Sequence, residues 1–137
     1  MTTALSCLVF FAAWTLGLVA FGIVPYRVGQ VLLAGRAANS FSAAEPEGPE
    51  WYQRLLRAHA NCVENLPVFA ALVLVGQAAG HAEGSFATLA QVVCAGRVGQ
   101  TLAHLSSGSA LVVNVRFTFF VVQLGAMAAM AWQLLAG

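Results

Sequence analysis

Charge is scarce in this 137-residue sequence: only 8% of the residues are charged, and neither Lys nor Asp occurs. By contrast, 60% of the residues are hydrophobic. Such a composition offers no basic surface for nucleic acid and leaves no room for a soluble domain, so we expect no nucleic-acid partner. The three cysteines, Cys7, Cys62 and Cys94, lack the spacing of a metal motif or a disulfide framework, so we expect no metal site.

Long runs without charged residues make up most of the sequence. Residues 4–26, 65–82, 98–115 and 117–137 contain no Asp, Glu, Lys or Arg, and about 20 apolar residues suffice to cross a bilayer. The first run exceeds the apolar region of a secretory signal, so we expect it to be retained. The sequence predicts one domain over residues 1–137. Its fold class is all-α integral membrane, an up-down bundle of four transmembrane helices at about residues 4–35, 50–80, 85–105 and 110–135.

The arginines suggest how this bundle is oriented. Arg36, Arg54 and Arg57 flank the loop between the first two helices, and Arg116 follows the turn between the last two. Cytoplasmic loops carry the excess of positive charge in membrane proteins. We therefore expect these two loops on the cytoplasmic side and both termini on the opposite side.

A polar stripe interrupts the second predicted helix. Arg54, Arg57, Asn61 and Glu64 fall on one helical face roughly 80° wide. An arginine near the bilayer centre costs on the order of 3 kcal/mol, so polar side chains at membrane depth usually serve a function. We expect the functional site to include this stripe.

The third helix repeats the pattern, because Arg97, Gln100 and His104 also share one face. Arg116 enters the fourth helix at a similar depth, and Glu64 is the sole acid deep enough to neutralise these cations. The charged side chains can pair with one another or reach the interface. However, the excess of arginine over acid favours an anionic ligand.

Residues 57–69 read RAHANCVENLPVF. This segment closely resembles the signature of the membrane-associated proteins in eicosanoid and glutathione metabolism, the MAPEG family. The resemblance extends to Gly96-Arg97-Val98 in the third helix and to the arginine that opens the fourth. The nearest members are the small bacterial ones, which implies a location in the bacterial inner membrane.

The resemblance implies a homotrimer that binds glutathione between subunits, near the cytoplasmic side. It also implies a lipophilic small molecule or lipid as second substrate, supplied from the surrounding membrane lipids. Arg116 would be the catalytic residue, close to the glutathione sulfur. The residues implied in binding glutathione are Arg57, Asn61, Glu64, Arg97, Gln100 and His104.

Four positions depart from the eicosanoid-forming members. Gln100 and His104 stand where those proteins carry His and Tyr, and Phe117 and Phe120 stand where Ser and Tyr are found. The leading interpretation is a glutathione transferase or peroxidase that attacks lipophilic electrophiles with the thiolate. The alternative is a non-catalytic lipid-binding or scaffold protein on the same fold. A proton-coupled transporter is a third interpretation, which the arginines around Glu64 disfavour.

Overall fold

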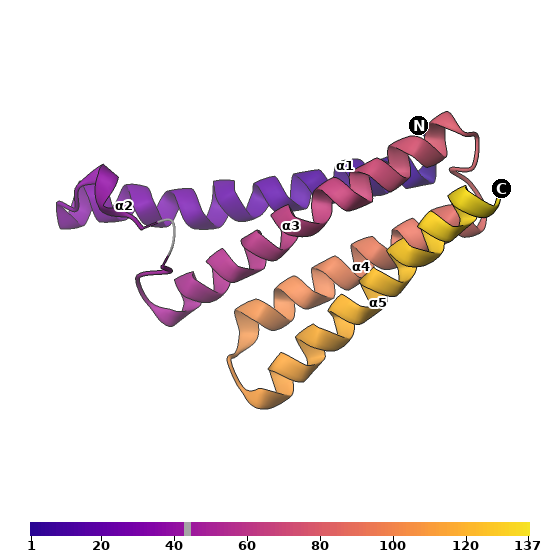
Figure 1. The fold of residues 1–137 in the computed structure, drawn as a ribbon. Coiled ribbons are helices and arrows are strands. Elements are labelled where there is room, and N and C mark those ends of the chain that lie inside the picture. The colour runs from indigo at the N-terminus through magenta and orange to yellow at the C-terminus, as the bar shows by residue number, and fades with distance from the viewer. Residues whose placement is uncertain (43–44) are drawn as a thin grey trace.

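The computed structural model describes residues 1–42 and 45–137, and all regular structure within them is helical (Figure 1). Four helical segments lie within two residues of the predicted ranges, which confirms the all-α prediction. The elements in chain order are α1 (Thr3–Leu18), η1 (Val19–Ile23), α2 (Val24–Ala34), η2 (Ala38–Ser40), α3 (Glu50–Ala78), α4 (Ser85–Ser106) and α5 (Ala110–Ala136).

The first helical segment changes its helix type just before Pro25. α1 continues into η1, a single π-helical turn, and α2 follows with Pro25 in its first turn. Proline lacks an N–H group, so it fits the start of a helical segment better than the interior. Gly22 lets this turn approach α3, because an added Cβ would lie 2.6 Å from Cδ2 of Leu55. The segment therefore stays continuous while packing closely against α3.

The helices alternate in direction, so both chain ends meet the turn between α3 and α4 at one end of the bundle (Figure 1). Two hydrogen bonds hold this end together: Thr2 Oγ1 donates to Gln77 Oε1 at 2.7 Å, and Gln133 Nε2 donates to Ser85 Oγ at 3.2 Å. The α2–α3 loop and the α4–α5 turn lie at the opposite end, which we call the loop end. Which side of the membrane the loop end faces stays a prediction.

Aromatic and aliphatic side chains from α1, α3, α4 and α5 form the core. Phe11 and Phe69 are fully buried with ring centroids 5.5 Å apart, and Phe86 packs onto Gly76, where an added Cβ would lie 2.6 Å from the ring. Small residues such as glycine are common where membrane helices pack closely. Met130 adds a buried side chain from α5.

Among the described residues, three helical segments are long and apolar enough to cross a membrane: Thr3–Ala34, Glu50–Ala78 and Ala110–Ala136. Four spanning helices were predicted, and α4 does not meet this measure of length and composition on its own. The reason lies in its polar side chains, since Arg97, Gln100, Thr101 and His104 are all buried inside the bundle. Neighbouring helices thus shield the polar face of α4 from lipid.

Candidate functional site

A groove of about 290 Å3 lies between α3, α4 and α5. Five of the seven residues predicted for the site line it, although they are far apart in sequence. They come from three helices, and three apolar residues of α5 complete the wall. The lining residues are Asn61, Glu64, Gln100, His104, Val113, Arg116, Phe117 and Phe120.

His104 joins the two sides of this groove. Its Nδ1 lies 2.9 Å from Nη1 of Arg116, and its Nε2 lies 3.2 Å from Nδ2 of Asn61. A guanidinium can only donate, so Nδ1 accepts and the neutral imidazole carries its proton on Nε2. Nε2 then carries a proton and does not accept from the Asn61 amide nitrogen. That amide nitrogen donates to the carbonyl oxygen of Arg57 at 3.2 Å. Arg116 therefore occupies the one acceptor of the His104 ring, on the side of the groove opposite Asn61.

Gln100 links the groove to a polar layer inside the bundle. Its Oε1 accepts from Nη1 of Arg97 at 2.9 Å and from Nε2 of Gln123 at 3.1 Å. Gln123 also donates to the carbonyl oxygen of Phe119 at 2.8 Å, and it packs over Gly96. These bonds fix the Gln100 amide, so its position at the groove wall is set from behind.

Arg97 lies within this layer and not on the groove. Its side chain is only 1% exposed, and its guanidinium carbon lies 5.2 Å from the centroid of the Phe11 ring. Within residues 1–42 and 45–137, its Nε and Nη2 atoms have no hydrogen-bond partner. The structure thus places Arg97 behind Gln100, where it holds that side chain.

Arg57 lies one turn from Asn61 along α3, and its side chain is exposed. It borders two further cavities at the loop end. One, of about 470 Å3, is lined by Glu50, Gln53, Arg54 and Gly108 as well; the other, of about 210 Å3, is also lined by Arg27 and Leu56. Arg57 therefore extends the polar surface of the groove toward the loop end.

The charges of this region are unbalanced. Among the residues that the structure describes, the ion pairs are Arg36 with Glu47 and Arg54 with Glu50, both at the loop end. Neither Arg57, Arg97 nor Arg116 has a carboxylate within 4.0 Å in that part of the chain. The predicted excess of positive charge over acid is thus present around the groove.

Sequence reasoning did not identify several residues of the site. Gln123 is fully buried in α5, and Trp14 Nε1 donates to the buried Thr101 hydroxyl at 3.2 Å. The sequence signal for Gln123 was a glutamine in the middle of an apolar helix. Nothing in the pattern distinguished Trp14 from a lipid-facing aromatic residue.

Other residues with reactive side chains lie apart from the groove. Cys62 is fully buried in the apolar core, and His81 is exposed in the turn between α3 and α4. His59 does not line the groove. No group of three or more His, Cys, Asp or Glu side chains that could hold a metal ion is found in the described parts of the chain.

The groove and its arginines have a counterpart in a known family. The model of the MAPEG family matches residues 4–136, which is almost the whole chain. No curated protein matches the chain. The match includes all four helical segments and every residue that lines the groove, and members of this family include glutathione transferases and peroxidases. The chain therefore belongs to the MAPEG family.

Proposed function

We propose that this protein is a glutathione-dependent membrane enzyme that transfers the glutathione thiolate to lipophilic electrophiles. One observation carries the proposal: Arg116 lines a groove inside the helical bundle beside His104, and no carboxylate of the described chain lies within 4.0 Å of its guanidinium. Buried charge of this kind is stable when a ligand supplies the opposite charge. Glutathione supplies two carboxylates, one ammonium group and a thiol.

The groove offers a partner for each part of this tripeptide. Arg57 and Asn61 suit a carboxylate, since both present N–H donors at the loop end of the groove. Glu64 suits the ammonium group, since it is the one acid among the described residues that line the groove. Gln100 and His104 supply further polar contacts, and Arg97 positions Gln100 from inside the bundle.

Arg116 suits the sulfur. It is half-buried beside His104 and borders the groove together with Phe117 and Phe120. A guanidinium there stabilises the thiolate over the thiol: lowering a thiol pKa of about 8.5 by about two units requires roughly 2.7 kcal/mol. The thiol proton leaves to solvent, and the thiolate forms a carbon–sulfur bond as the leaving group departs or the carbon is protonated.

The lipophilic substrate would reach the sulfur along the apolar wall. Phe117 is 64% exposed on the outer surface of α5, and Val113 precedes it by one turn. Aromatic side chains facing a bilayer offer contact area to a molecule dissolved in the lipid. A hydrophobic electrophile can thus enter from the membrane.

A homotrimer forms part of the proposal. Arg57 and Glu64 are both exposed in the single chain, whereas glutathione recognition in a membrane requires charges shielded from lipid. A neighbouring copy of the chain would cover this face of α3. The trimer would complete the site between subunits.

A second candidate is a non-catalytic lipid-binding or scaffold protein. The composition of the groove favours it in one respect: within the described residues, no Ser, Thr or Tyr hydroxyl lines the groove, and Phe117 and Phe120 flank Arg116. Thiolate stabilisation would then rest on Arg116 alone. Glutathione binding without a thiolate signal would support this candidate.

Calorimetry of glutathione binding to detergent-purified protein tests the proposal. We expect saturable binding that Arg57→Ala abolishes or strongly weakens, while Arg54→Ala, which removes an arginine paired with Glu50, keeps it. We also expect thiolate absorbance in the ultraviolet that disappears in Arg116→Ala. Absence of binding to the unmodified protein would overturn the proposal.

A further inference from the structure

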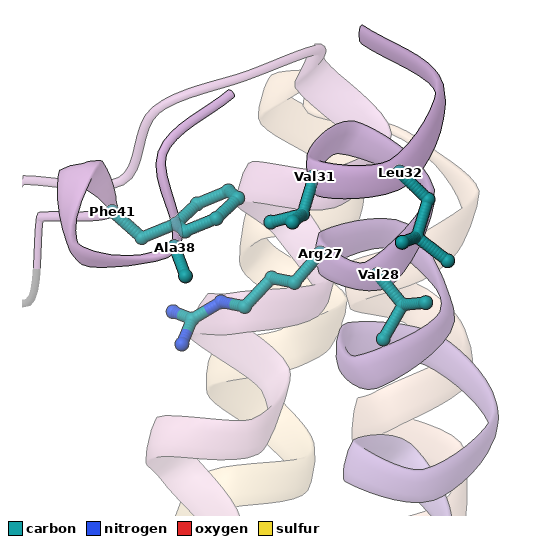
Figure 2. Close-up of a pocket in the computed structure, with 6 residues that line it drawn as sticks. All are labelled: Arg27, Val28, Val31, Leu32, Ala38 and Phe41. Carbon is teal, nitrogen blue, oxygen red and sulfur yellow. The ribbon is translucent and has the colours of Figure 1, made fainter. Parts of the chain in front are cut away.

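A second groove, of about 360 Å3, lies at the loop end between α2 and the segment around η2 (Figure 2). It shares no lining residue with the groove of the proposed glutathione site. We call it the α2 groove. Figure 2 shows the Arg27 side chain extending from α2 toward Ala38 and Phe41. One guanidinium thus meets an otherwise apolar lining, made of Val28, Val31, Leu32, Ala38 and Phe41.

The outer wall of the α2 groove is held in place by Arg36. Its Nε donates to Oγ of Ser40 at 2.8 Å, its Nη2 donates to the carbonyl oxygen of Ser40 at 3.1 Å, and it pairs with Glu47. The Arg36 guanidinium also lies 4.3 Å from the centroid of the Phe41 ring. This network fixes Phe41, so the groove is a built feature of the fold.

Arg27 and Arg36 differ in how their charges are balanced. Both guanidinium groups lie over Phe41, Arg27 at 5.2 Å from the ring centroid. Arg27 donates from Nε to the hydroxyl of Tyr52 at 2.9 Å, but no carboxylate of the described residues lies within 4.0 Å of it. A hydroxyl and a ring face leave the charge uncompensated, and this favours an anionic occupant.

Aromatic side chains mark the membrane level of the α2 groove. Tyr26 stacks on Tyr52 with centroids 3.9 Å apart and meets Trp51 edge-on at 5.3 Å. Tyr and Trp gather where the hydrocarbon core meets the headgroups. The 32 residues of Thr3–Ala34 extend about 48 Å, longer than a hydrocarbon core of about 30 Å. The end of α2 therefore reaches the headgroup region.

We propose that the α2 groove binds an anionic phospholipid of the leaflet at the loop end. The phosphate pairs with Arg27, and hydrocarbon of the same lipid packs on Val28 and Leu32. Leu32 and Leu33 are 75% and 90% exposed at this level, as suits contact with lipid. A phospholipid combines one negative charge with apolar surface, as the lining of the groove requires. This inference does not depend on the proposed function.

Native mass spectrometry of the detergent-purified protein tests this proposal, with phosphatidylglycerol and phosphatidylcholine as probes. We expect the unmodified protein to prefer phosphatidylglycerol. Arg27→Gln should lower that affinity about fivefold, which corresponds to about 1 kcal/mol for one charge at the interface. Arg27→Lys should keep the preference for phosphatidylglycerol because it keeps the charge. Phe41→Ala should weaken the binding of both lipids.

Arg54→Gln is the matched control, since Arg54 also lies at the loop end but is paired with Glu50 and does not line the α2 groove. An equal loss in Arg54→Gln and Arg27→Gln would overturn the proposal in favour of diffuse attraction. Preference for oleate over phosphatidylglycerol would also overturn it. So would displacement of phosphatidylglycerol by glutathione, because Arg27 also borders the cavity that Arg57 lines.

Discussion

Two arginines at the loop end, Arg36 and Arg54, are balanced in a different way from the arginines around the groove. Arg36 and Arg54 each lie within salt-bridge distance of a glutamate of the same chain. In the described parts of the chain, Arg97 and Arg116 have neutral hydrogen-bond partners only. A cation whose counter-ion is encoded in the sequence stabilises the chain itself. Arg116 has no such counter-ion in the described chain and lines the groove, so its charge is available to a ligand.

Replacing Arg116 should have the largest effect on the glutathione thiolate. We expect Arg116→Leu to lower the amount of bound thiolate about 25-fold near pH 7, because a rise of the glutathione thiol pKa from about 6.5 to about 8.5 lowers the ionised fraction from roughly three quarters to about 3%. Thiolate absorbance of the glutathione complex measures it. Arg36→Leu, which removes an arginine paired with Glu47, should leave the signal unchanged. An intact signal in Arg116→Leu would remove the distinction between the two groups of arginines.

Replacing Arg57 should weaken glutathione binding. Loss of a charge-assisted pair to a carboxylate costs about 2–3 kcal/mol, so we expect the Kd of Arg57→Ala to rise about 30- to 150-fold. Arg54→Ala, one turn earlier on α3, should change the Kd less than about fivefold, because Arg54 already has a carboxylate partner, Glu50, whose side chain is 92% exposed, and such pairs contribute little. Equal effects of the two changes, measured by calorimetry, would contradict a special role for Arg57.

Replacing Arg97 should separate stability from binding. Its buried guanidinium has two nitrogen atoms without partners in the described chain, and replacing buried charge by apolar side chains is often neutral or stabilising by about 1–4 kcal/mol. We expect Arg97→Met to keep or raise the unfolding temperature while weakening glutathione binding severalfold, since Gln100 loses a donor. A large fall in unfolding temperature would show that Arg97 stabilises the bundle.

Removing a counter-ion at the loop end should have the smallest effect. Glu47→Gln breaks the ion pair with Arg36, and the Glu47 side chain is half exposed. Surface pairs contribute about 0–1 kcal/mol, so we expect a change of that size in unfolding free energy and none in glutathione affinity. Chemical denaturation and calorimetry measure the two quantities. A change in glutathione affinity would mean that the loop end and the groove are coupled.

The helices and the polar stripe could be predicted because they depend on local pattern. Apolar runs fix the spans, and the spacing of Asn61 and Glu64 fixes a face of α3 whatever surrounds it. The side of α4 on which each residue acts could not be predicted. Arg97, Gln100 and His104 share one face by spacing, yet Arg97 meets Phe11 of α1 while His104 meets Arg116 of α5. Only the packing of neighbouring helices decides this.

The π-turn and the α2 groove lay outside sequence reasoning for a similar reason. η1 is a π-helical turn just before Pro25, and the helical segment continues through both. Arg27 and Phe41 are separated by a loop, and their contact depends on how Arg36 folds that loop back. Long-range contacts of this kind leave no periodic signal.

Titration of the unmodified protein with glutathione, followed by calorimetry and by thiolate absorbance on the same sample, tests the central claim most directly. The account predicts saturable binding accompanied by a thiolate signal, because the unpaired arginines at the groove receive their counter-ions from the ligand. Failure of glutathione to bind would contradict it, and the arginines around the groove would then serve helix packing or another anion.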